Sequence, residues 1–125
     1  MMICRESYLF IRGRYFTDKN FLTGKLSEYV RIKDELVETE EISEKVSMLK
    51  IRDTLLLIGN IIKEDLDEEF YIGTINAGIA NKNIAFIIIK KNEGNLAVCC
   101  YAREGLIKQH TARKAIEKFE RELLR

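Results

Sequence analysis

Residues 84–89 read Ile-Ala-Phe-Ile-Ile-Ile, and this stretch decides the predicted fold. Both of its alternating faces are apolar and four of its six residues are β-branched, which is typical of a central strand covered on both sides. A turn follows in which Gly94 stands between two asparagines, and residues 96–101 (Leu-Ala-Val-Cys-Cys-Tyr) form a second apolar segment. Because Gly and Asn tolerate positive φ, the two segments are predicted to pair as a β-hairpin.

The segment after the hairpin changes to helical spacing. Over residues 106–124 the apolar side chains fall on one stripe and charged side chains cover the rest of the surface, with the stripe formed by Ala112, Ala115, Ile116, Phe119 and Leu123. We therefore predict an amphipathic helix that packs on the hairpin. The residues expected to be buried together are Phe119, Ile116, Ile87, Ile89 and Val98.

The upstream sequence supplies the remaining elements. Residues 7–16 are aromatic and β-branched, and they predict a strand with a bulge or bend at Gly13. Residues 53–67 predict a helix that starts at Asp53 as its N-cap, and its apolar arc is wide enough for burial between layers. A strand over residues 70–75 and a loop over residues 76–83 then lead to the hairpin.

Residues 23–51 leave two structures open. Leu22, Leu26, Tyr29 and Val30 fall loosely on helical spacing in Glu-rich and Lys-rich surroundings, which favours a helix. Residues 29–32 and 46–51 also fit short strands of a meander. We favour the helix over this region.

The predicted fold class is α+β. A largely antiparallel sheet of four or more strands is packed by two or more helices in two layers, and an amphipathic C-terminal helix closes the fold. At 125 residues, the length fits one domain over residues 1–125. This order of elements is similar to that of longin-like and profilin-like adaptor domains, a similarity of arrangement that no motif accompanies.

Composition narrows the class of protein. The 21 basic and 20 acidic residues give a net charge of +1, so no overall field attracts nucleic acid or an anionic membrane. No apolar run is long enough to span a bilayer and the N-terminus shows no secretory signal, which predicts a soluble, cytoplasmic protein. The three cysteines cannot all pair within one chain, and we expect them to be reduced.

The motifs that carry chemistry are incomplete. Gly73 and Gly78 have the spacing of a phosphate-binding P-loop, but Ile and Ala stand where Lys and Ser/Thr are required. Cys4, Cys99, Cys100 and His110 lack the spacing of a zinc site. A nucleophile pair of Cys99 or Cys100 with His110 needs an exposed, electropositive thiolate, whereas both cysteines lie in an apolar strand. We predict no metal, no cofactor and no catalytic site.

Charged segments give two further hypotheses. Arg12 and Arg14, next to Tyr15 and Phe16, have the basic and aromatic character of an RNA-binding strand, but their order departs from the RNP1 motif, so nucleic-acid binding is disfavoured. An edge strand that its arginines protect from pairing fits them better. The carboxylates of residues 38–41 and 64–69 are interpreted as solvated faces.

Two functions remain. The favoured one is a non-catalytic protein-interaction module, an adaptor or a subunit of an assembly, whose partner is another protein or a second copy in a homodimer formed through a sheet edge or a helix face. The alternative is a small-ligand-binding or enzymatic domain with a pocket near the loop of residues 73–83. There the polar or flexible residues expected to converge are Asn76, Gly78, Asn81 and Asn83.

Overall fold

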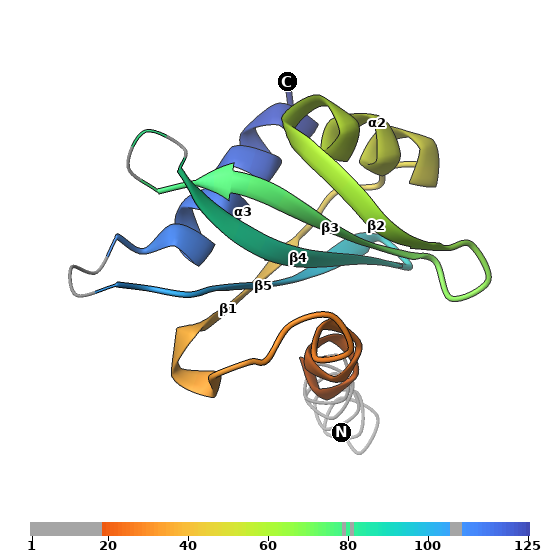
Figure 1. Ribbon diagram of the computed structural model, residues 1–125. Coiled ribbons are helices and arrows are strands. Elements are labelled where there is room, and N and C mark those ends of the chain that lie inside the picture. Colours follow the sequence, from red (N-terminus) through yellow and green to blue (C-terminus); the bar gives the residue numbers. More distant parts are fainter. Residues whose placement is uncertain (1–18, 79, 81, 106–108) are drawn as a thin grey trace, which may run out of the picture.

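A five-stranded sheet is the centre of the computed structural model, which describes residues 19–125 except 79, 81 and 106–108. The strands are β1 (Val37–Ile42), β2 (Gly59–Asp65), β3 (Phe70–Ala77), β4 (Asn83–Asn92) and β5 (Asn95–Ala102). Their order across the sheet is β1-β5-β4-β3-β2, and every neighbouring pair is antiparallel (Figure 1). The strand predicted over residues 7–16, with Arg12 and Arg14, lies outside the described residues.

Helices lie on both faces of this sheet. The helices α2 (Met48–Ile58) and α3 (Thr111–Leu123) cover one face, and a helix over residues 19–26 lies against the other (Figure 1). A short 3₁₀ helix, η1 (Asp34–Leu36), leads into β1. The α+β class, the antiparallel sheet and the closing helix are thus confirmed, and the helix over residues 19–26 adds cover on the second face. None of the described helices is long and apolar enough to cross a membrane.

The β4–β5 hairpin has the predicted form. Asn92 pairs with Asn95, and Gly94 between them adopts a φ of 84°. Ile87 and Ile89 of β4 belong to the core cluster under α2 and α3, whereas Ile88 belongs to the cluster under the helix of residues 19–26. β4 is therefore buried on both faces, as its uniformly apolar sequence predicts.

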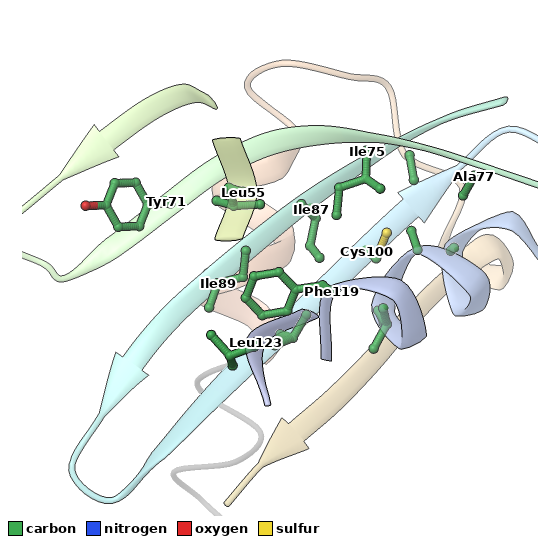
Figure 2. Close-up of a cluster of buried hydrophobic side chains, with 14 of the residues drawn as sticks. Leu55, Tyr71, Ile75, Ala77, Ile87, Ile89, Cys100, Phe119 and Leu123 are labelled. Atoms are coloured by element: carbon green, nitrogen blue, oxygen red, sulfur yellow. The ribbon is translucent and has the colours of Figure 1, made fainter. Parts of the chain in front are cut away.

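The main core lies between the sheet and the two helices α2 and α3. Its members come from every strand except the edge strand β2, and the five residues expected there, Phe119, Ile116, Ile87, Ile89 and Val98, are all fully buried. Figure 2 shows Phe119 of α3 close to Ile87, Ile89 and Leu123. On the other face, Leu22 and Leu26 pack with Phe70, Ile72, Ile88 and Cys99.

The helix predicted over residues 53–67 is wrong at both ends. α2 begins after Ser47, whose Oγ accepts a hydrogen bond from the Lys50 N–H at 3.1 Å, and the chain changes directly to β2 at Gly59. A Cβ at Gly59 would fall on the Thr74 carbonyl oxygen of β3. Only glycine allows the two strands to approach so closely there, so the apolar residues after Gly59 belong to a strand rather than to a helix.

Residues 23–51 also differ from both predicted alternatives. The helix ends at residue 26, β1 occupies Val37–Ile42, and residues 29–32 and 46–51 form no strand. The Glu-rich β1 segment favours a helix by intrinsic propensity, but its six residues pair with β5, from Val37 opposite Tyr101 to Ile42 opposite Leu96. Tertiary pairing overrides the local preference. The C-terminal helix is shorter than predicted, because α3 begins at Thr111.

Replacing Phe119 by Ala is expected to lower the free energy of unfolding by about 3–5 kcal/mol, because the substitution leaves a cavity between α3 and the sheet. Urea unfolding followed by circular dichroism measures this change. Leu124→Ala is the control, since Leu124 is 48% exposed and its loss removes little buried contact. Equal stability of Phe119→Ala and the wild type would contradict the described core.

Candidate interaction surface

The predicted ligand loop is fastened to the start of α3. Asn83 donates hydrogen bonds from Nδ2 to Gln109 Oε1 at 2.9 Å and to Thr111 Oγ1 at 3.1 Å. Gly78 has a φ of 77°, and a Cβ there would lie 2.8 Å from Gln109 Oε1. The glycine therefore supplies both a left-handed backbone and the room for this polar contact.

The four residues predicted to bind a ligand do not all meet. Gly78 and Asn83 lie together, whereas Asn76 is exposed on β3 and its carbonyl oxygen accepts a hydrogen bond from Lys118 Nζ at 3.1 Å. Asn81 lies outside the described residues. The amide of Asn83 contacts groups of its own chain, so this loop cluster holds the fold together, and its ligand-binding role stays a prediction.

Glu104 caps α3, a role that sequence reasoning missed. Its carboxylate accepts hydrogen bonds from the N–H groups of Thr111 at 2.7 Å and Gln109 at 3.1 Å. Partial burial raises the pKa of Glu104, but these hydrogen bonds to the charged form outweigh it, and the net pKa is lowered. Glu104 precedes the helix by seven residues, outside the usual capping positions, so no local signal identifies it.

Arg113 joins α3 to the edge strand β1. Its guanidinium donates to Glu40 Oε2 at 2.7 Å, to Glu38 Oε2 at 2.9 Å and to the Thr39 carbonyl oxygen at 3.2 Å. Desolvation lowers the pKa of Arg113, and the two carboxylates more than reverse that effect, so the net pKa is raised. Glu38 and Glu40 are thus partly exposed ion-pair partners of Arg113, and Glu41 is exposed.

A small cleft lies beside this ion pair. Its volume is about 210 Å³, and it is lined by Glu35, Leu36, Glu38, Glu104, His110, Ala112 and Arg113. Pockets for small organic ligands are typically about 300–1,000 Å³ and mostly apolar. The cleft is smaller and more polar than such a site, and three of its lining groups, Glu38, Glu104 and Arg113, are hydrogen-bonded within the fold.

The two described cysteines occupy opposite faces of β5. Cys100 belongs to the core under α2 and α3, Cys99 belongs to the core on the other face, and neither is paired in a disulfide. Burial raises the pKa of Cys99 to about 11 and raises that of Cys100 as well. His110, in contrast, is exposed at the N-cap of α3. Such thiols lack the exposure and thiolate character that a nucleophile requires.

The geometry of Cys99 and Cys100 does not support a metal site. The side chains of Cys99 and Cys100 point to opposite sides of the sheet, as expected for neighbours in a strand. Among the described residues, no three His, Cys, Asp or Glu side chains lie close enough to hold a metal ion. Cys4 lies outside those residues.

Among the described residues, α2 carries three of the exposed large apolar side chains. Leu49, Leu56 and Leu57 are 62%, 50% and 72% exposed, and we call them the leucine face. The opposite side of α2, with Ile51 and Leu55, is buried on the sheet. The wide apolar arc of this helix predicts burial between layers, but the described residues cover only one side of α2 (Figure 1). The outer half of the arc is exposed.

Both sheet edges carry features that oppose pairing with another strand. On β1, Glu38 and Glu40 point inward beneath α3, toward Arg113. On β2, the register shifts between Ile61 and Lys63, so Ile62 forms a bulge. Inward charges and bulges are common protections of edge strands. The leucine face is therefore the better candidate for contact with a partner.

Glu104→Gln is expected to lower the free energy of unfolding by about 0.5–1 kcal/mol at pH 7, because the helix cap loses its charged acceptor. The folded pKa of Glu104 lies below its ordinary value of 4.5, so its stabilisation is complete above that pH and is lost as the pH falls through the folded pKa. The difference between variant and wild type should shrink in acid. Urea unfolding at pH 7 and pH 3 measures it, with the exposed Glu117→Gln as the control; an unchanged difference would contradict the cap.

Native thiol labelling should be slow in a Cys4→Ser variant, because Cys99 and Cys100 are buried and their pKa values are raised. Mass spectrometry after treatment with a thiol reagent near neutral pH should find both cysteines unmodified, and both modified when the protein is unfolded in urea. Rapid labelling of both thiols in the folded protein would instead support the Cys-His nucleophile.

Comparison with known proteins adds no assignment to this geometry. A scan against models of protein families finds no match for this chain, and a search of curated proteins finds none either.

Proposed function

We propose that this chain is a non-catalytic protein-interaction module, an adaptor or a subunit of an assembly, and that the leucine face of α2 is its contact surface. The observation that carries the proposal is the exposure of Leu49, Leu56 and Leu57 on one helix whose other side is packed in the core. Adjacent exposed apolar side chains with a polar rim are characteristic of protein-interaction sites.

The surroundings of the leucine face fit this role. Lys50, Arg52 and Asp53 are exposed on the same helix, so charged side chains accompany the leucines. A helix that presents leucines at spacings of seven and eight residues offers anchors two turns apart on one side, and apolar grooves or helices of partner proteins recognise such anchors. Burial of a leucine side chain contributes about 1.5–3 kcal/mol when complete, so three of them can support a specific contact.

The state of the polar groups also favours an interaction module over an enzyme. Asn83, Glu104 and Arg113 have partners within the fold, and the described thiols are buried. A catalytic site needs polar groups that converge on an open space where a substrate can be held. The small-ligand alternative rests on the loop of residues 73–83, where Gly78 and Asn83 lie together.

A photo-crosslinking phenylalanine analogue at position 57 should form covalent adducts with a protein in cells that produce this chain. The same analogue at position 66 is the matched control, because Leu66 is also exposed, at 61%, in the turn between β2 and β3. The adduct should disappear in the Leu49→Lys variant, which keeps the fold but disrupts the leucine face. Absence of any protein adduct from position 57 would overturn the proposed contact surface.

A further inference from the structure

We infer that the leucine face binds a second copy of this chain, with the two α2 helices antiparallel about a two-fold axis between residues 52 and 53. The inference rests on the proposed function and names its partner. It is carried by a self-complementary order of side chains along the exposed side of α2. A two-fold axis is the commonest symmetry of soluble homo-oligomers, and it requires such self-complementarity.

The apolar residues satisfy this requirement. In an antiparallel pair centred between residues 52 and 53, Leu49 of one copy lies level with Leu56 of the other, on both sides of the axis. Both leucines are exposed, and they lie seven residues apart, two turns along the same side of the helix. Leu57 flanks them and widens the apolar contact. Each copy therefore offers the apolar side chains that the other one covers.

The charged residues select the antiparallel orientation. The same axis sets Arg52 of one copy level with Asp53 of the other, so two cations and two anions meet at the centre. In each single chain the side chains of Arg52 and Asp53 are 44% and 65% exposed, and Arg52 Nη1 lies 3.9 Å from Asp53 Oδ1. A parallel pair would set Arg52 level with Arg52 and Asp53 level with Asp53, and like charges would oppose association.

The size of the surface sets the strength of association. α2 has 11 residues and is therefore about 16 Å long, which limits the contact to a few turns of helix. Interfaces below about 1,200 Å² are typically weak and transient. We therefore expect a dimer that dissociates on dilution.

Sedimentation equilibrium of the full chain over a wide concentration range tests the dimer. The wild type should approach twice the monomer mass at the highest concentrations and the monomer mass on dilution. Leu56→Lys should weaken association at least about tenfold, which corresponds to about 1.4 kcal/mol. Leu66→Lys is the matched control, since it places the same charge on an exposed leucine away from α2, and it should associate like the wild type.

A charge-reversal pair tests the geometry and guards against misfolding. Arg52→Glu leaves two acids at the centre of α2, and Asp53→Lys leaves two bases, so each variant alone should be monomeric. An equimolar mixture should associate again, because the acids of one copy then lie level with the bases of the other. Restored association shows that both variants are folded, a result that no general loss of stability can produce.

The outcomes separate this inference from the proposed function. A wild type that stays monomeric at every concentration, or a dimer that is unaffected by Leu56→Lys and by both charge reversals, overturns the α2 pairing. If position 57 nevertheless cross-links to a different protein, the interaction module stands with another partner. If it cross-links to no protein, both proposals fail.

Discussion

The burial of β4 on both of its faces is the constraint on which this fold depends. Ile87 and Ile89 need one apolar layer and Ile88 needs another, so the sheet must carry helices on both sides of this strand. Pairing with β3 and β5 satisfies the backbone of β4, and α3 supplies Phe119 and Ile116 to the first layer. Elements farther from β4 are less fully covered: β1 and β2 are edges, and α2 is packed on one side only.

The elements that the sequence predicts are those whose own residues carry a clear pattern, either a uniformly apolar strand, a glycine turn or an apolar helical stripe. Gly94 between two apolar segments predicts the β4–β5 hairpin. The apolar run at residues 70–75 predicts β3, and the stripe that contains Phe119 predicts α3. β1 could not be predicted, because the contacts that hold its residues in a strand come from β5 and Arg113, far along the chain. The end of α2 depends in the same way on how close Gly59 lies to Thr74. Contacts between distant segments have no local signature.

The same limit applies to the candidate surface. The apolar arc of α2 is visible in the sequence, and its width suggests complete burial. Which half stays exposed depends on the number of layers above α2, which periodicity does not reveal. Gly78 and Asn83 meet as expected, but their partners Gln109 and Thr111 come from a segment more than 25 residues away. Glu104 and Arg113 likewise take their roles only from the folded chain.

The ion pairs of Arg113 on α3 with Glu38 and Glu40 on β1 bear on the order in which the elements fold. Strands β2 to β5 form a meander of neighbouring antiparallel pairs, so each new strand closes only a short loop. β1, in contrast, joins β5 from the other end of the sequence, and the Arg113–Glu38 pair links residues 75 positions apart. The entropy lost in closing so long a loop is offset only after the meander and α3 exist as a template. We therefore expect β1 to be the last strand that the folding chain adds, so that its detachment leaves the four strands β2 to β5 paired.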